Sequence, residues 1–247
     1  MTVSPADDRG SPGGVPGESA GVAGAPHDMP VPETPSVVAV SGGPPAGGAQ
    51  PHASSGGEAA VRGLVARAMA APARLGPVRL VCIDGPAGSG KTTTAAAVER
   101  VAAAEGLDVH VLHLDDLYDG WSGLEGTLWP RLSAQVLEPL RRGWRGRFQR
   151  YDWPSGRFAE WVDVPVPALL LLEGCGSAQR AADAVAVLRV WVEAPDDVRL
   201  ARGLARDGAA ARRHWEAWMR DEAEHFARER TRERADLRLD ATGRPLP

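Results

Sequence analysis

The sequence predicts an α/β domain with a mainly parallel sheet flanked by helices, preceded by a disordered tail. From residue 58 onward, apolar runs of strand length alternate with longer stretches of helical composition. Three chemically useful positions fall at the ends of such runs, which is typical of a ligand-binding sheet edge: Gly85, Asp115 and Glu173. Residues 1–57 differ, because they hold 10 Pro, 12 Gly and no aromatic residue. Such a segment cannot bury enough apolar surface to offset the entropy lost on ordering, so we expect a tail over 1–57 and one domain over 58–247.

Short runs rich in Val, Ile and Leu predict buried strands, and stretches rich in Ala, Glu and Arg predict helices. We expect strands over 78–83, 108–114, 168–172, 187–192 and 236–240. We expect helices over about 58–71, 93–104, 133–142 and 196–235. Outside its helix, the region 117–164 is mixed and rich in Trp, Gly and Arg. Because strands and helices alternate, most strands should run parallel.

Composition and charge narrow the classes of partner. The formal net charge of −4 gives no sign of a nucleic-acid-binding surface. No apolar stretch approaches membrane-spanning length, and the acidic start (Asp7, Asp8) is unlike a signal peptide. We therefore expect a cytoplasmic protein without nucleic-acid or membrane partners, with Cys82 and Cys175 as buried thiols. A homo-oligomer is compatible with the sequence.

The most specific motif lies in a glycine-rich segment after the first expected strand. Residues 85–92 read GPAGSGKT, the complete phosphate-binding pattern G-x-x-x-x-G-K-[ST], between a strand and a helix. Lys91 is the only lysine in the chain, against 27 arginines, and its flexible ammonium can reach β- and γ-phosphates. Thr92 can offer its hydroxyl to Mg²⁺ at the helix start. The motif predicts a nucleoside triphosphate site, with ATP held by Gly85, Ala87, Gly88, Ser89, Gly90, Lys91, Thr92 and Thr93.

Two acidic positions stand at the ends of later strands, on the same predicted edge. Asp115 could accept a proton from an acceptor hydroxyl or hold Mg²⁺ through water. Asp116 is its rival, and successive extended residues face opposite ways, so one of the two should face the site. The alternative for this pair is helix capping or a turn. Glu173 has the geometry of a metal-supporting acid, and its alternative is a surface carboxylate.

Arginines at three- and four-residue spacing follow the fourth strand. Arg199, Arg202 and Arg206 share one face of the expected helix. Such a row could close over the phosphates and supply positive charge in the transition state, and the ordinary alternative is a solvated helix face. We expect Arg202 and Arg206 to act as lid residues.

These motifs together resemble the uridine kinase and phosphoribulokinase branch of P-loop kinases. The resemblance rests on the loop at 85–92, the D-x-x-Y pattern from Asp115 to Tyr118, the Leu-Glu-Gly run at 172–174, and the lid run 197–207. It implies Asp115 as catalytic base, Tyr118 as an acceptor contact, Glu173 as a magnesium-side acid, and Arg202 and Arg206 as phosphate clamps. Tyr151 and Asp152 resemble the pair that lines the family's nucleoside pocket.

The chain departs from that family in two places. Gly203 stands where the family usually carries a second arginine, and the ribose-binding His-Pro-x-x-Phe-Asp stretch has no clear counterpart. The intervening region holds tryptophans that could be core or could wall an acceptor pocket: Trp121, Trp129, Trp144 and Trp153. We expect an ATP- and Mg²⁺-dependent small-molecule kinase, most simply of a nucleoside.

Two alternatives remain open from the sequence. The text of the phosphate loop also resembles the cytidylate kinases, which suggests a nucleoside monophosphate kinase. The D-T-G-A-M-Y-R segment that those enzymes carry after the first helix is absent. A nucleotide-binding regulator with little or no turnover is the third reading, and it differs from both kinases in needing no acceptor.

Overall fold

The computed structural model describes residues 55–247. The expected tail lies outside these residues, apart from its last three positions, which begin helix α1 (Ser55–Ala70). Within residues 55–247, no helix is both long enough and apolar enough to cross a membrane.

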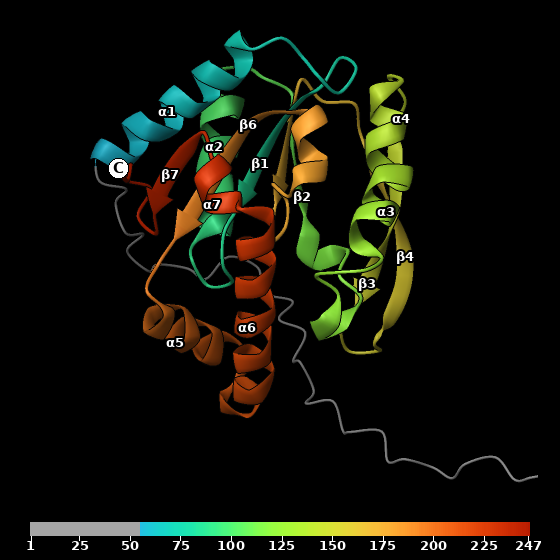
Figure 1. The fold of residues 1–247 in the computed structure, drawn as a ribbon. Helices are drawn as coiled ribbons and strands as arrows, with labels where there is room; N and C mark the ends of the chain where they lie inside the picture. The colour runs from blue at the N-terminus through green and yellow to red at the C-terminus, as the bar shows by residue number, and fades with distance from the viewer. Residues whose placement is uncertain (1–54) are drawn as a thin grey trace, which may run out of the picture. The chain divides into compact units, whose positions relative to one another are not determined.

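A five-stranded sheet forms the centre of the domain, as Figure 1 shows. Its strands are β1 (Arg79–Asp84), β2 (Val109–His113), β5 (Leu169–Glu173), β6 (Ala186–Glu193) and β7 (Leu237–Asp240). The order is β2-β5-β1-β6-β7, and every neighbouring pair is parallel. The five expected strands and the parallel sheet are therefore confirmed. The carboxyl ends of β1, β2 and β5 lie at one edge, where their polar residues can meet.

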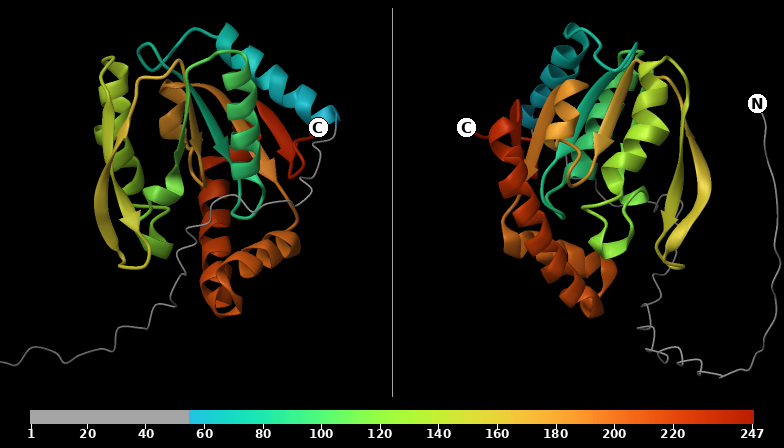
Figure 2. Two further views of the ribbon diagram at one scale, coloured as in Figure 1. Left: turned by 180° about the vertical axis from the view of Figure 1, so that it is seen from behind. Right: turned by 45° about the vertical axis from the view of Figure 1, so that its right-hand side comes forward.

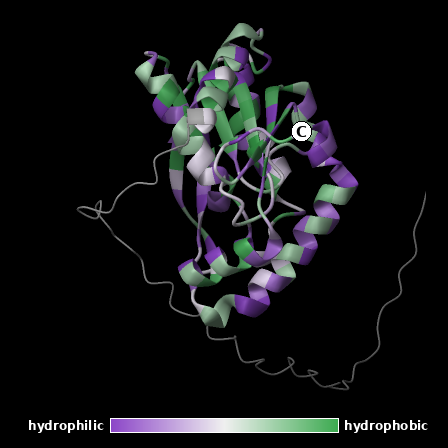
Figure 3. Ribbon diagram, turned by 90° about the vertical axis from the view of Figure 1, so that its left-hand side faces the viewer, coloured by the Kyte–Doolittle hydropathy of each residue, from purple (hydrophilic) through white to green (hydrophobic). Residues whose placement is uncertain are grey.

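Each face of the sheet has its own hydrophobic core. Along β1, Val81 and Ile83 point to one face, whereas Leu80 and Cys82 point to the other, as the two-residue period of a strand requires. Helices α1 and α2 (Lys91–Ala104) cover the first face. The second face packs against helices from the middle and the end of the chain (Figure 2). Figure 3 shows the strands at the centre of the domain in the green of apolar residues.

The region 117–164 contains more regular structure than its sequence predicts. Helices α3 (Leu128–Leu132) and α4 (Glu138–Arg141) are joined by a π-helical turn over 133–137, which together account for the expected helix. Strands β3 (Gly146–Asp152) and β4 (Arg157–Val164) then form an antiparallel hairpin. An irregularity between Gln149 and Tyr151 shifts the register. This bulge breaks the alternation by which a strand is recognised from sequence.

The prediction of one continuous helix over 196–235 was wrong, because the segment is divided into three helices. These helices are α5 (Asp196–Asp207), α6 (Arg212–Glu229) and α7 (Thr231–Arg234). Gly208, with a φ of 87°, ends α5, and Arg230, with a φ of 53°, separates α6 from α7. Because both residues have left-handed backbones, a continuous helix is excluded at each point. The break at Gly208 lets α5 and α6 pack as a helical pair beyond the sheet edge (Figure 1).

Candidate active site

The phosphate-binding loop follows β1 and takes a conformation that depends on glycine. Gly85, Gly88 and Gly90 have φ values of 140°, 76° and 106°. A Cβ on Gly85 would lie 2.1 Å from the Val192 carbonyl oxygen, and one on Gly88 would lie 2.8 Å from the Arg199 carbonyl oxygen. The loop therefore curls against β6 and α5 with no room for side chains. It leaves a backbone cradle of the kind that holds phosphate oxygens.

Asp84, the last residue of β1, anchors the base of this loop. Its fully buried carboxylate accepts hydrogen bonds from the backbone N–H groups of Gly85 (2.7 Å), Gly176 (2.9 Å) and Ala178 (2.7 Å). Burial raises its pKa to about 6, against the lowering effect of these N–H groups and of Lys91. Asp84 thus ties the loop after β1 to the loop after β5.

Lys91 lies beneath the loop with only 7% of its surface exposed. Its ammonium donates to the Pro86 carbonyl oxygen at 3.1 Å and lies 3.7 Å from the Cys175 sulfur. Burial disfavours its charge, but the acidic groups around it, Cys175, Glu173 and Asp115 foremost, outweigh this and raise the pKa of Lys91. The residue is therefore a cation at neutral pH, held where the predicted β- and γ-phosphates would lie.

Two oxygen ligands suited to Mg²⁺ meet between α2 and β5. The Thr92 hydroxyl donates to Glu173 Oε2 at 3.3 Å, and His113 Nδ1 lies 2.8 Å from the same oxygen. The hydrogen bond to Glu173 raises the pKa of His113, against the effect of burial. No cluster of three or more acidic, His or Cys ligands occurs within residues 55–247. The residues present fit Mg²⁺, because Mg²⁺ usually takes one or two protein oxygens and completes its shell with phosphates and water.

The two neighbouring aspartates after β2 have different surroundings. Asp116 forms an ion pair with Arg150 of β3, with 3.4 Å between Oδ2 and Nε. Asp115 is reached by solvent and interacts electrostatically with Glu173, Lys91 and Arg206. Desolvation by the surrounding protein and the charge of Glu173 raise the pKa of Asp115, while Lys91 and Arg206 oppose them. Of the two, Asp115 is the one directed to the phosphate loop.

The predicted lid arginines lie on α5 beside the loop. Arg202 donates to the Gly88 carbonyl oxygen at 3.0 Å, and Arg206 forms a bidentate ion pair with Asp207 at 2.7 and 3.0 Å. A pocket next to the loop is lined by Gly88, Arg202, Gly203, Arg206 and Trp215. Gly203 is required there, because a Cβ would lie 2.2 Å from the indole of Trp215. Trp215 thus covers Gly203 on this face of α5.

Two proteins of known structure are similar to this domain. A possible uridine kinase from Bacillus stearothermophilus is similar in structure, with a TM-score of 0.55 and 20% identity over 74% of this chain and 98% of that one. A protein described as a fructose transport system kinase from Silicibacter sp. TM1040 gives a TM-score of 0.51 and 22% identity, with the same coverage. The chain has the fold of the P-loop kinases. The predicted resemblance is confirmed at the level of the fold. Neither a family model nor a curated protein matches the chain.

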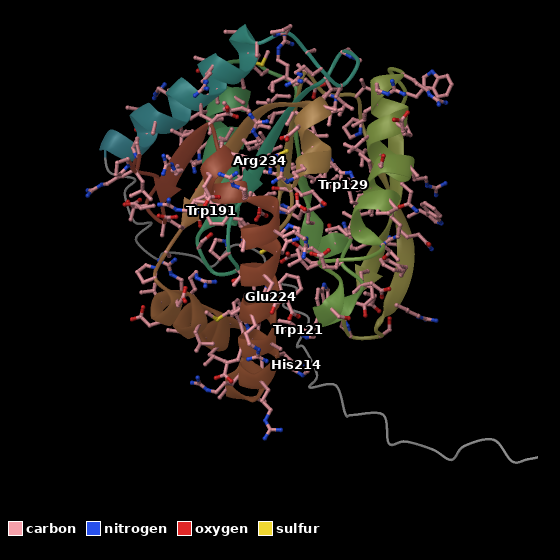
Figure 4. All side chains as sticks on the ribbon, viewed as in Figure 1. Trp121, Trp129, Trp191, His214, Glu224 and Arg234 are labelled. Carbon is pink, nitrogen blue, oxygen red and sulfur yellow. The ribbon has the colours of Figure 1, made fainter. Side chains whose placement is uncertain are left out.

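In this P-loop kinase fold, a group of aromatic residues lies next to the segment that carries Asp115. Trp121 is their centre: its ring stacks on His214 of α6 (5.4 Å, 18°) and meets Trp153 edge-on at 5.7 Å. Figure 4 shows Trp121 and His214 side by side near α6. The Trp153 indole donates to the Asp115 carbonyl oxygen at 3.0 Å. Trp121 and Trp153 are therefore part of the surroundings of Asp115, whereas Trp144 is 62% exposed at the start of the hairpin.

The three residues expected to contact an acceptor occupy different positions. Tyr118 is 1% exposed, and its hydroxyl donates to the Cys175 carbonyl oxygen at 2.9 Å. Tyr151 packs edge-on against Trp153 at 5.3 Å. Asp152 ends β3 and accepts a hydrogen bond from Ser155. Tyr151 thus belongs to the aromatic group beside Asp115, and Tyr118 lies in the core beneath it.

One pair of functional candidates has no sequence signal of its own. Arg199 and Glu222 are both buried and form an ion pair of 2.6 Å behind the phosphate loop. They come from different helices, and the spacing of the arginines predicted a role for Arg202 and Arg206 and none for Glu222. Only the packing of α5 on α6 brings Arg199 and Glu222 together.

Proposed function

We propose that the protein is an ATP- and Mg²⁺-dependent kinase that transfers the γ-phosphoryl group to a hydroxyl of a small molecule, most simply a nucleoside. One observation carries this proposal: the Asp115 carboxylate lies within electrostatic reach of Lys91, Glu173 and Arg206, while Asp116 is paired elsewhere. A phosphate-loop lysine, a metal-side acid and a free carboxylate are the groups that transfer to a hydroxyl needs.

The nucleotide side of the reaction uses the loop and α2. Lys91 and the loop amides bind the β- and γ-phosphates, because the glycine cradle presents N–H groups and the ammonium lies directly below it. Thr92 and Glu173 hold the metal. Bound Mg²⁺ supplies positive charge that polarises the phosphates.

Asp115 accepts the proton of the acceptor hydroxyl. Its raised pKa makes it a better base than an ordinary surface aspartate. Trp153 holds the backbone of Asp115 through its indole N–H, so the carboxylate is presented from a fixed position.

Arg202 and Arg206 supply positive charge from the lid. Arg202 already contacts the loop through the Gly88 carbonyl oxygen, and Arg206 interacts electrostatically with Asp115. Donors that are in place before reaction stabilise the charge that develops on the transferred group.

The acceptor is bound on the aromatic side of Asp115. Trp121 and Trp153 offer flat apolar surface there, which favours a planar base or the apolar face of a sugar, and the buried Tyr151 packs against Trp153. Tyr118 supports the site through its bond to the Cys175 carbonyl, and Asp152 stands at its rim. The two kinases with the same fold bear names that refer to uridine and fructose, and both carry hydroxyl groups.

The test is ADP formation against a panel of nucleosides, nucleoside monophosphates, sugars and other small alcohols, with and without Mg²⁺. We expect metal-dependent ADP formation that rises at least about tenfold with the right acceptor, and most strongly with a nucleoside. A nucleoside monophosphate as the best acceptor would establish the cytidylate-type alternative. ADP formation that no acceptor accelerates would overturn the kinase proposal in favour of a nucleotide-binding regulator.

A further inference from the structure

The buried Arg199–Glu222 pair has no part in the mechanism above. Glu222, on α6, is 1% exposed and Arg199, on α5, is 4% exposed. Arg199 Nη1 lies 2.6 Å from Glu222 Oε1, and Nη2 lies 2.7 Å from Asp196 Oδ1. The cost of removing two charges from water usually cancels most of the attraction in such a pair. Stability alone therefore gives little reason for it.

Both members of the pair hold the same residue of the phosphate loop. The Ala87 N–H donates to Glu222 Oε2 at 2.8 Å, and Arg199 Nη1 donates to the Ala87 carbonyl oxygen at 3.0 Å. The backbone of Arg199 also presses on Gly88, where a Cβ would clash with its carbonyl oxygen at 2.8 Å. The backbone polar groups of Ala87 are thus fixed by two side chains from the helical pair α5–α6.

Other contacts hold the Glu222 carboxylate in place. The Trp218 indole N–H donates to Oε2 at 3.1 Å, and the Cys175 thiol lies 3.5 Å from the same oxygen. Arg199 Nε, by contrast, is buried without a hydrogen-bond partner among the described residues. The guanidinium is instead oriented so that Nη1 serves Glu222 and Ala87 together.

We infer that Arg199 and Glu222 are positioning residues, which fix the Ala87 peptide and so determine the shape of the phosphate cradle. The inference rests on the proposed function, since it concerns how that same loop holds Mg·ATP. It also links the lid helix to the loop: a shift of α5 would move Arg199, and with it the Ala87 carbonyl group. A misplacement of about 1 Å in such a loop can cost about 10²-fold in rate.

The experiment separates loop geometry from stability. In the double variant Arg199→Met/Glu222→Leu, apolar side chains of similar volume replace the ion pair, a change that is often neutral or stabilising. In Glu222→Gln the charge is lost at constant shape. The controls are Glu229→Gln, the same change on α6 at a carboxylate that accepts the Arg180 N–H, and Val65→Ala, a core change that lowers stability far from the loop.

The dissociation constant for Mg·ATP is measured by calorimetry at a temperature where every variant is folded, and kcat and KM are measured with the best acceptor. For the double variant and Glu222→Gln we expect affinity about 10–100-fold weaker than wild type, by analogy with groups that orient metal ligands. Both controls should bind as wild type does. Affinity that follows melting temperature across all four variants, or wild-type affinity in the double variant, would overturn the inference. A wild-type protein that does not bind Mg·ATP would instead sink the proposed function, and the inference with it.

Discussion

Arg150 on β3 pairs with Asp116, with 3.4 Å between its Nε and the Asp116 Oδ2, and this contact leaves Asp115 as the aspartate that faces Lys91. The two aspartates are adjacent and chemically identical, so the difference proposed between them rests on their contacts, of which the ion pair with β3 is one. Arg150 also pairs with Glu160 of β4, which fixes the guanidinium to the hairpin. The hairpin thereby determines which carboxylate is available at the sheet edge.

The adjacent aspartates give a matched pair of variants. Asp115→Asn should lower kcat by about 10²–10⁴-fold, the usual contribution of a positioned acid–base group, while the affinity for Mg·ATP changes by no more than a few-fold. Asp116→Asn should keep most of the activity, because its partner is Arg150. Steady-state kinetics with the best acceptor measure both. Normal turnover by Asp115→Asn would exclude it as the base and would make Asp116 the candidate.

Lys91 is the single ε-amine of the chain and can be followed by selective acylation. Because its ammonium is buried and its pKa is raised, it should react more slowly than the α-amino group of the same protein at any pH. Saturating Mg·ATP should slow it further and leave the α-amino group unaffected. Mass spectrometry of the labelled peptides at alkaline pH reports both rates. Equal labelling of Lys91 with and without Mg·ATP would contradict the phosphate site.

Two helical glycines should respond in opposite ways to alanine. Gly203→Ala places a methyl group 2.2 Å from the Trp215 indole and should destabilise the protein by about 1–3 kcal/mol through overpacking. Gly63→Ala lies on the exposed face of α1 with nothing within 4 Å, and should stabilise it by about 0.5–1 kcal/mol through helix propensity. Urea unfolding gives both values. The reading of Gly203 fails should its variant be as stable as the Gly63 variant.

Asp84 predicts a specific pH dependence of stability. Its pKa in the folded protein is about 6, above the ordinary value of 3.8, so its favourable contribution is complete below about pH 4 and is lost as pH rises through 6. The rise corresponds to about 3 kcal/mol. Asp84→Asn removes this titration and also leaves one of three backbone N–H groups without an acceptor. The variant's stability deficit should therefore be largest at low pH and shrink toward pH 7, as urea unfolding across that range would show. A deficit that does not vary with pH would contradict the assigned pKa.

Much of the fold could be predicted because its signals are local. The five strands are short apolar runs, and residues 85–92 carry a motif whose setting between strand and helix is visible in the sequence. The β3–β4 hairpin was missed because a bulge between Gln149 and Tyr151 interrupts the two-residue period that predicts a strand. The breaks at Gly208 and Arg230 were missed because arginine rarely adopts a left-handed backbone and Gly208 lies between strong helix formers.

Part of the candidate site could likewise be predicted from local signals, and the rest depends on contacts between distant segments. The residues proposed to bind phosphate and metal can be predicted from the motif and from the strand ends, and these signals bring Lys91, Thr92 and Glu173 into one prediction. The choice between Asp115 and Asp116 needed the position of Arg150, which lies on a hairpin the sequence did not predict. Arg199 and Glu222 are 23 residues apart on two helices, and only the packing of those helices makes them a pair.

The order of the strands has a consequence for how the chain is made. The central strand β1 begins at Arg79, but its partners β5 and β6 begin at Leu169 and Ala186. During synthesis on a ribosome, residues 79–92 emerge long before any strand that can pair with them, and Glu222 emerges later still. Contacts so distant along the chain form late and slow the folding of a domain. The proposed ligand, ATP, would therefore stabilise the finished domain by mass action and would not act as a template for the early stages of folding.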